Sequence, residues 1–320
     1  MKKSYVKFIC DPKNAYRGCP VWLYWSSELY SFGKYIRKYG YYPSFFPLAV
    51  YSDHSGPSFS DEPYLHEKKT KAPVFLAHRK LKVKNYIIGT NKKAYTLFSP
   101  AVFYRRSNSI NQYSLAEGTV CFPVHSLPNS GFEFDIDKYC NDLKKLPQEY
   151  HPIKVCLHMH DVNNGTDMKY IDRGYEVVSA GNTSDQRFIE RLYEIMRHAK
   201  YITSNDIGTI TFLAVEMRVP FFVYGDKENT INFSDRNFPI GIRERPSHPQ
   251  YIYLSQKLRL ADNFKILTYD YEVILEVESA LGVYDGISRI KMFRVLYLAL
   301  FLWIIKFKWF FWLKDKMKEK

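Results

Sequence analysis

The sequence predicts an α/β protein of two domains, each with its own sheet, that face each other across a cleft. The length of 320 residues suggests about two domains, and a hydrophobic content of 46% is enough for sizeable cores. After Gly118, apolar strands alternate with helical stretches. Five strands and four helices over residues 118–225 indicate right-handed βαβ units in a parallel sheet covered on both faces. Both domains are therefore expected to be Rossmann-like.

The second domain, residues 118–288, carries the clearer pattern. Its expected strands are Thr119–Val124, Ile153–His158, Tyr175–Ser179, Tyr201–Thr203 and Phe221–Tyr224, and its helices Asp135–Leu146, Asp167–Asp172, Gln186–Ala199 and Ile210–Arg218. Asp135 is a favourable N-cap, and Pro147 ends the helix that it begins. Further helices are expected near residues 255–281.

The first domain, residues 1–112, is expected to be smaller and less regular. Its expected elements are strands at Tyr5–Ile9, Pro47–Tyr51, Val74–Ala77 and Ala101–Tyr104, and a helix at Val21–Tyr39 that Gly40 ends. Residues 55–72 are rich in Pro, Ser and charge, which is typical of an exposed loop. A polar linker at 107–117 joins the two domains.

The net charge of +13 favours an anionic partner, which leaves nucleic acid, phosphorylated ligands or an anionic membrane surface. Nine basic and only two acidic residues lie between Arg289 and Lys320, so the rest of the chain is mildly basic. Nucleic-acid binding is not expected, because no RNP-like or helix-turn-helix pattern is present.

The cysteines favour a reducing, cytosolic compartment. The five cysteines are odd in number and form no CxxC pair, so buried thiols are the ordinary interpretation. The N-terminus, Met1–Phe8, has no long apolar region and no small-residue cleavage site, so we do not expect a signal peptide.

Ligands of open α/β sheets bind at the carboxyl ends of the strands, beside helix N-termini. In the second domain this rule selects the loops at 125–126, 158–161, 180–183 and 204–209. The last, Ser-Asn-Asp-Ile-Gly-Thr, offers backbone N–H groups, hydroxyls and a helix dipole to a diphosphate or phosphodiester. Helix capping by the same residues is an equally good interpretation. There is no GxGxxG and no GxxxxGK[ST] sequence.

Residues 201–222 resemble the donor half of GT-B glycosyltransferases. The resemblance lies in the strand at 201–203, the Ser-Asn-x-x-Gly-Thr turn, the helix with Glu216 and the Val-Pro-Phe-Phe that follows it. Residues 119–126, TVCFPVHS, resemble the first strand of that half in bacterial capsule and lipopolysaccharide transferases. The resemblance covers residues 118–225 and implies transfer of a sugar, or a polyol phosphate, from a nucleotide-activated donor to a surface polysaccharide or lipid-linked acceptor. It implies that Glu216 binds the ribose of the donor. The other implied donor-binding residues are His125, Ser126, His158, His160, Gly181, Ser204, Asn205, Gly208 and Thr209.

His158 and His160 also invite a metal interpretation, since residues i and i+2 of a strand share a face. The pattern HxHxDH fails, because Val162 and Asn163 stand where Asp and His are required. No DxD-type metal site is evident between the domains, so neither a metal nor another cofactor is expected. The alternatives are a hydrogen-bonding role or a contact with the donor phosphate.

Asp53 and His54 follow the strand at 47–51, on the loop expected to face the cleft. Histidine near its ordinary pKa removes protons at neutral pH, so His54 is the favoured base and Asp53 its alternative. An exposed loop histidine is the plainer interpretation, and His66 is a further candidate. Arg105 and Arg106 are expected either to bind an anionic acceptor or to form a solvated pair.

The C-terminal tail, residues 289–320, is basic and aromatic. Its longest uncharged run, Val295–Ile305, spans about 16 Å as a helix, well short of the ~30 Å of a bilayer core. An interfacial helix is therefore favoured, with Trp303, Trp309 and Trp312 at headgroup depth; a true span and packing on the protein's own core remain open. The tail would place the protein peripherally on the inner face of the cell membrane.

A different class of function stays open, namely a non-catalytic protein that uses the same scaffold to bind a membrane or a nucleic acid. The arrangement of the loops distinguishes the two. An enzyme is favoured if the loops converge on one cleft opposite residues 53–54, and is disfavoured if they form a flat face. The loops concerned are 158–161, 180–183 and 204–209.

Overall fold

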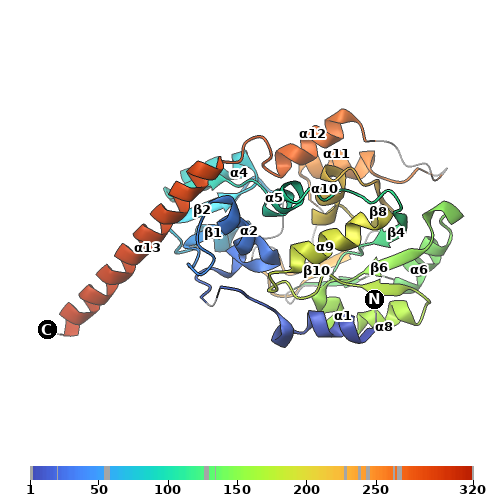
Figure 1. The fold of residues 1–320 in the computed structure, drawn as a ribbon, viewed down its shortest axis with the longest axis horizontal. Helices are drawn as coiled ribbons and strands as arrows, with labels where there is room; N and C mark the ends of the chain where they lie inside the picture. The colour runs from blue at the N-terminus through green and yellow to red at the C-terminus, as the bar shows by residue number, and fades with distance from the viewer. Residues whose placement is uncertain are drawn as a thin grey trace.

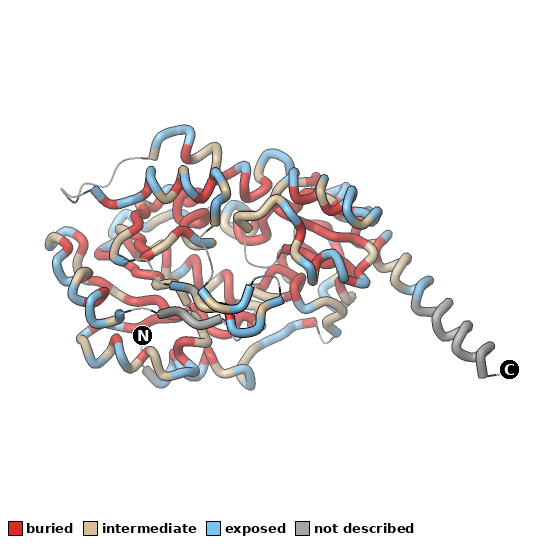
Figure 2. Tube along the Cα trace, turned by 180° about the vertical axis from the view of Figure 1, so that it is seen from behind, coloured by how far each residue is buried: buried red, intermediate tan, exposed pale blue. Residues whose placement is uncertain are grey.

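The computed structural model describes residues 3–19, 21–53, 58–125, 130–133, 135–226, 229–236, 239–242, 246–261, 264 and 269–318. They form two α/β domains and a long C-terminal helix that runs out from the first domain (Figure 1). Buried positions run through both sheets and across the junction between the domains (Figure 2). All five cysteines are buried and none forms a disulfide.

The second domain contains a five-stranded parallel sheet, as the alternation of strands and helices predicts. Its strands, in the order β7-β6-β4-β8-β9, are β4 (Glu117–Cys121), β6 (Ile153–Cys156), β7 (Glu176–Val178), β8 (Ala199–Ser204) and β9 (Phe221–Val223). The connecting helices are α6 (Ile136–Lys144), α7 (Met159–Asn163), α8 (Thr166–Ile171), α9 (Phe188–Arg197) and α10 (Thr209–Glu216). Strands are added first on one side of β4 and then on the other, so a topological switch point lies between β4 and β8.

The first domain contains a three-stranded parallel sheet in the order β1-β2-β3. Its elements are β1 (Val50–Ser52), β2 (Val74–Ala77), β3 (Lys93–Thr96), α2 (Phe32–Tyr39), α3 (Leu65–Lys68), α4 (Lys80–Thr90) and α5 (Pro100–Ser107). The strand expected at 74–77 is confirmed. The strand expected at 101–104 is wrong, because Pro100 takes the first position of a helix that contains these residues.

The helix expected at 21–39 is shorter than predicted. Two 3₁₀ turns, η2 (Trp25–Ser27) and η3 (Leu29–Ser31), precede α2. Tyr30 and Ser31 have left-handed φ values of 56° and 63°, which no α-helix accommodates. The helix therefore begins only at Phe32.

The strand expected at 5–9 is also wrong, since α1 (Lys3–Cys10) is a helix. Its buried residues Val6, Ile9 and Cys10 have helical spacing and join the core of the second domain. The Ile9 carbonyl accepts a hydrogen bond from the Asn182 backbone N–H at 2.8 Å. The start of the chain thus packs on the second domain, across the boundary expected at residue 112.

The remaining elements complete the second domain and return the chain to the first. A small antiparallel sheet, which the sequence did not predict, is formed by β5 (Ser130–Glu133), β10 (Asn229–Asn232) and β11 (Gly241–Ile242). Helix α12 (Tyr271–Ala280) lies within the region where helices near 255–281 are expected, and α11 (Pro249–Lys257) begins before that region. The Ile287 N–H then donates to the Thr96 carbonyl of β3 at 3.0 Å.

Helix α13 (Arg289–Lys318) begins against the first domain and then extends beyond it (Figure 1). Its buried residues are Met292, Val295, Leu296 and Ala299. The first half of the tail thus packs on the protein's own core, the alternative that the sequence left open. Trp303 is partly buried against the same core. No helix in the described part of the chain combines the length and the apolar character needed to cross a bilayer.

Candidate functional site

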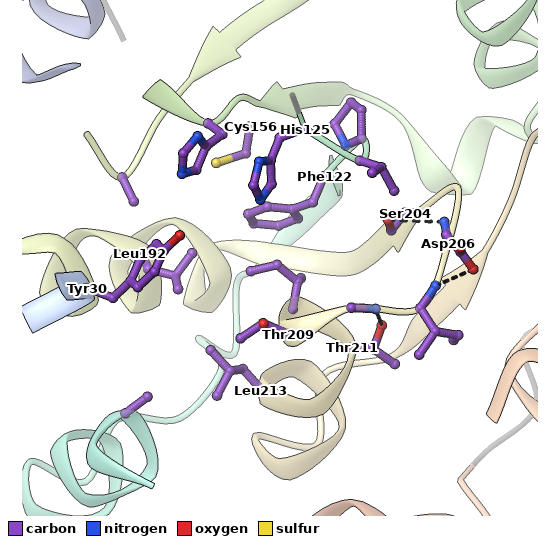
Figure 3. Close-up of a pocket in the computed structure, with 18 of the residues that line it drawn as sticks. Tyr30, Phe122, His125, Cys156, Leu192, Ser204, Asp206, Thr209, Thr211 and Leu213 are labelled. Atoms are coloured by element: carbon purple, nitrogen blue, oxygen red, sulfur yellow. Dashed lines mark hydrogen bonds between the residues drawn. The ribbon is translucent and has the colours of Figure 1, made fainter. Parts of the chain in front are cut away.

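A cavity of about 410 Å³ lies between the two domains, at the carboxyl ends of β4, β6, β7 and β8. The second domain lines it with loop residues that follow each of these strands: His125, His158, Ala180, Ser204 and Gly208, among others. Tyr30, Phe32, Phe59, Ser99 and Ala101 of the first domain form the facing wall. The loops at 158–161, 180–183 and 204–209 therefore converge on one cavity rather than on a flat face. Figure 3 shows lining residues from both domains, among them Tyr30, His125 and Ser204.

The start of α10 forms the polar end of the cavity, as the sequence predicts for residues 204–209. Ser204, Gly208 and Thr209 line it. The Gly208 N–H donates to Thr211 Oγ1 at 3.1 Å, and the Asp206 N–H donates to Ser204 Oγ at 3.4 Å (Figure 3). A side chain on Gly208 would meet no atom within 4 Å, so a ligand can approach the backbone here. The positive end of the helix dipole suits this end of the cavity to an anionic group.

Two histidines form a second wall. The imidazole rings of His125 and His158 stack with centroids 4.0 Å apart and planes 14° apart. Burial, together with the neighbouring His125 and His160, lowers the pKa of His158 to about 2. Its ring is therefore neutral over the whole physiological range.

The tautomer of His158 follows from its contacts. His158 precedes α7, and its Nδ1 accepts a hydrogen bond from the His160 N–H at 3.3 Å. The proton of the neutral ring must therefore be on Nε2. This buried Nε2 has no hydrogen-bond partner among the described residues. Since His158 lines the cavity, a bound acceptor oxygen would supply one.

His160 does not share a strand face with His158, as the sequence analysis expected it to. Both lie beyond the end of β6, with His160 inside α7, and their ring centroids are 4.9 Å apart. Burial, followed by the charge of His125, lowers the pKa of His160, which does not line the cavity. Within the described ranges, no group of three or more His, Cys, Asp or Glu side chains is arranged to hold a metal ion.

Two predicted donor-binding residues have structural roles instead. Gly181 has a φ of 89°, and a Cβ on it would lie 2.8 Å from Arg191 Nη2 and 2.9 Å from the Ile9 carbonyl oxygen. Asn205 is buried, and its Oδ1 accepts a hydrogen bond from the Val124 N–H at 2.9 Å. Neither lines the cavity, because packing against α1 and the β4 loop occupies them.

Glu216 has a different role from the one that the resemblance implies. The resemblance implies that it binds ribose, but its side chain is fully buried outside the cavity. Arg105 Nε and Nη2 each lie 2.6 Å from its carboxylate oxygens, and Arg106 Nε lies 2.8 Å from Oε1. These arginines come from α5 of the first domain, so Glu216 joins the domains rather than holding a ligand. The expected acceptor-binding or solvated role of the two arginines is replaced by this interdomain ion pair.

Asp53 is likewise not exposed to the cleft. It is buried, does not line the cavity and lies 2.9 Å from Lys82 Nζ. Burial would raise the pKa of its carboxyl, but the charges of Lys82 and His78 outweigh that effect and hold the pKa below its usual range. Asp53 is therefore a structural anion and not a base. The favoured base, His54, and the donor-binding candidate Ser126 lie outside the described residues.

Asp206 and Tyr30 are cavity residues that the sequence analysis did not single out. The hydroxyl of Tyr251 on α11 lies 2.8 Å from Asp206 Oδ1 and 3.0 Å from Oδ2, which fixes this carboxylate at the cavity. Asp206 lies inside the turn predicted to bind phosphate, so its position in the sequence could have predicted that it lies at the cavity. Burial raises the pKa of Tyr30 to about 12. Nothing in the local sequence marks Tyr30, because its place depends on a left-handed turn.

No protein-family model matches the chain, and no characterised protein matches it in sequence. Among solved structures, the wall teichoic acid polymerase TagF is similar over 93% of this chain and 92% of the TagF chain, with 12% identity and a TM-score of 0.40. A second TagF structure, of a substituted form soaked with CDPG, covers 94% of this chain and 93% of that chain, with 10% identity and a TM-score of 0.41. Similarity at this level carries no conclusion about the activity of this chain.

Proposed function

We propose that this protein is a glycosyltransferase that moves a sugar, or a related polyol phosphate, from a nucleotide-activated donor to a surface polysaccharide or a lipid-linked acceptor. The observation that supports it best is the interdomain cavity at the carboxyl ends of four parallel strands. Open α/β sheets bind their ligands at this edge. The resemblance of residues 118–225 to the donor half of GT-B enzymes agrees with this placement.

The donor phosphates are assigned to the start of α10. Ser204 and Thr209 contribute hydroxyls, and Gly208 allows a phosphate to approach the backbone. The Nε2–H of His158 provides a neutral donor on the adjacent wall. Asp206 supplies the carboxylate nearest to this end and takes over, in this proposal, the hydroxyl-binding role that the sequence assigned to Glu216.

The proposed reaction breaks one bond and forms one. In sugar transfer, a hydroxyl oxygen of the acceptor bonds to the reacting carbon of the sugar, and the bond from that carbon to the donor phosphate breaks, its electrons leaving with the nucleotide. In polyol phosphate transfer, the acceptor oxygen bonds instead to the phosphorus that carries the polyol, and the bond from that phosphorus to the nucleoside monophosphate breaks, its electrons leaving with that nucleotide. The acceptor proton passes to a base, for which His54 remains the prediction. The cavity contributes by positioning the two substrates and by stabilising the negative charge that develops on the departing phosphate.

Gly208→Val tests the phosphate site. Gly208 has an extended φ of −153°, and a Cβ on it would meet no atom within 4 Å, so valine adds its side chain at a residue that lines the cavity. We expect nucleotide release from the donor to fall about a hundredfold, the scale typical of a lost phosphate-stabilising contact, with an unchanged melting temperature. Gly89→Val is the matched control, because its Cβ position on α4 is equally open and lies outside the cavity.

The assay uses a panel of UDP-, GDP- and CMP-activated sugars and nucleotide-activated polyols, and measures the nucleotide released. No release from any donor by the unaltered protein would count against a transferase. Equal losses in the Gly208 and Gly89 variants would remove the phosphate site from the start of α10.

The proposed place of action is the inner face of the cell membrane, with the tail as a peripheral anchor. Phe301, Ile304 and Ile305 on α13 are exposed, and Lys306 follows them. Exposed apolar groups beside lysines suit the boundary between headgroups and acyl chains. This placement would bring the cavity near a lipid-linked acceptor.

A further inference from the structure

Five lysines gather at the amino edge of the sheet in the first domain, and we call them the lysine ledge: Lys68, Lys69, Lys71, Lys92 and Lys93. Lys68 ends α3, Lys71 precedes β2, and Lys93 begins β3. Val74 of β2 pairs with Lys93 of the parallel strand β3, so both segments meet at the same edge. The cavity residues Phe59 and Ser99 follow the strands at the opposite, carboxyl edge. The lysine ledge is therefore separate from the candidate donor site.

Hydrogen bonds hold the lysine ledge in one arrangement. Lys92 Nζ donates to the Thr70 carbonyl at 2.6 Å and to the Lys68 carbonyl at 3.3 Å. Burial, followed by the charge of Lys306, lowers the pKa of Lys92, so α13 brings a sixth lysine close to the same edge. Like charges are thus placed together at an electrostatic cost that an anionic partner would relieve.

Among the described residues, one acidic side chain pairs with the lysine ledge. Glu62 lies 3.8 Å from Lys68, and both side chains are largely exposed. In the part of the chain that the structure describes, no acidic side chain forms an ion pair with Lys69, Lys71 or Lys93, all of which are exposed. The positive field of the lysine ledge is therefore directed into solvent.

The outer face of α13 carries an apolar stripe that leads to the lysine ledge. Its exposed members, spaced by three to five residues, are Ile290, Phe293, Leu298, Phe301 and Ile304. They lie between the positions Met292, Val295 and Ala299, which are buried against the first domain. The solvent side of the helix therefore combines this apolar stripe with the exposed basic residues Lys291 and Arg294, and the stripe ends near Lys306.

We propose that the lysine ledge and this stripe form one surface that binds anionic lipid headgroups. A soluble polyanion would be recognised by the lysines alone, whereas a lipid surface also accepts the apolar side chains beside them. The inference extends the peripheral placement proposed above: the folded first domain, and not only the distal tail, contacts the membrane. It does not depend on the chemistry of the cavity.

Two variants of the full-length chain with equal charge changes test the surface. The ledge variant replaces Lys68, Lys69, Lys71 and Lys93 with Gln and retains Lys92, which holds the arrangement. The control variant replaces four exposed lysines of the second domain, Lys144, Lys145, Lys169 and Lys200, with Gln. Binding is measured by co-sedimentation with vesicles of phosphatidylcholine, with and without phosphatidylglycerol.

We expect the ledge variant to lose at least about tenfold in partition onto the phosphatidylglycerol vesicles, because each lysine near an anionic surface adds measurably to binding. The control variant should bind as the unaltered protein does, and added salt should reduce the difference between the two. Equal losses in both variants would show a net-charge effect and overturn the proposal. Unchanged vesicle binding by the ledge variant, with loss of binding to soluble polyphosphate, would assign the lysines to a polyanion and also overturn it.

Nucleotide release measured on the same variants separates this inference from the proposed function. The ledge variant should release nucleotide from a soluble donor at the unaltered rate, since the lysine ledge lies at the edge away from the cavity. Ledge-dependent vesicle binding by a protein that releases no nucleotide would remove the transferase and leave the lipid surface standing.

Discussion

The Glu67 carboxyl is buried in the first domain, 2.8 Å from Lys82 Nζ. Burial and the neighbouring Asp53 carboxylate raise the pKa of Glu67 from 4.5 to about 8. The folded chain therefore holds a proton on Glu67 between these two pH values, while the unfolded chain has lost it. Rising pH across this interval must reduce the contribution of Glu67 to the free energy of unfolding, because the folded state holds a proton on Glu67 that the unfolded state has lost.

Glu67→Gln tests this dependence. Glutamine resembles the protonated acid and does not titrate, so the loss of stability that Glu67 causes between about pH 5 and 8 should be absent from the variant. The lowered pKa values of His78, His158 and His160 raise the stability of both proteins with rising pH, so the difference between the two proteins isolates the effect of Glu67. Urea denaturation at several pH values measures the effect. Asp53 does not interfere, because its lowered pKa places its titration below the interval. The same slope in the variant and the unaltered protein would show that Glu67 is ionised in the folded chain.

At the scale of single residues, the sequence predicts local positions and fails on distant pairs. Ser204, Gly208, Thr209, His125 and His158 line the cavity, because each follows a strand or begins a helix, and such positions are visible in a local pattern. Glu216 was misassigned because its partner Arg105 is 111 residues away. Asp53 was misassigned because Lys82 comes from a helix that the sequence did not reveal. Ion pairs of this kind depend on tertiary packing.

At the scale of elements, the ion pairs between α5 and α10 can be tested by substitution. Glu216→Gln leaves the Arg105 and Arg106 guanidinium groups at the domain junction without their counter-charge. Such a loss typically costs about 3 kcal/mol of the free energy of unfolding. Denaturation measures the cost, and Glu194→Gln is the control, since Glu194 is 57% exposed on α9. Weaker nucleotide binding at unchanged stability would instead restore Glu216 as a ligand of ribose.

The elements themselves were predictable where apolar runs are long and evenly spaced. In the second sheet, nearly every position of β4 and β6 is buried on both faces, although Lys154 interrupts the apolar run of β6. The segment Tyr5–Ile9 is too short for its sequence to distinguish the periodicity of a helix from that of a strand. Its helical conformation is explained only by its contacts with the second domain. Strand β3 escaped notice because lysines occupy its start. Strand pairing, and not composition, makes that segment a strand.

At the scale of the whole molecule, the two ends of the chain are exchanged between the domains. Helix α1 packs on the second domain, and the start of α13 packs on the first. Arg289 on α13 donates to the carbonyl oxygens of Tyr39 and Lys38 and lies over the ring of Tyr41 at 3.9 Å. The sequence alone presents Arg289 as a solvated charge before an apolar stretch. Its neighbours lie about 250 residues away, so this exchange was not predictable.

The exchange determines how the tail must be shortened to test membrane anchoring. Deletion of residues 289–320 removes Met292, Val295, Leu296 and Ala299 from the core of the first domain. A fully buried aliphatic side chain contributes about 2 kcal/mol, and a whole domain is stable by only about 5–15 kcal/mol. We therefore expect this deletion to unfold the first domain or to lower its melting temperature severely. Weak vesicle binding by such a protein would say nothing about the tail.

Deletion of residues 307–320 is the informative change. It removes five lysines and two tryptophans, Trp309 and Trp312, and leaves the buried residues of α13 in place. The shortened protein should melt at the temperature of the full chain and bind phosphatidylglycerol vesicles more weakly, with the remaining binding carried by the lysine ledge and the exposed stripe. Thermal denaturation and co-sedimentation on the same preparation measure both effects. Full vesicle binding by this protein would rule out the distal tail as the anchor, and a lowered melting temperature would show that the distal helix packs on the folded body.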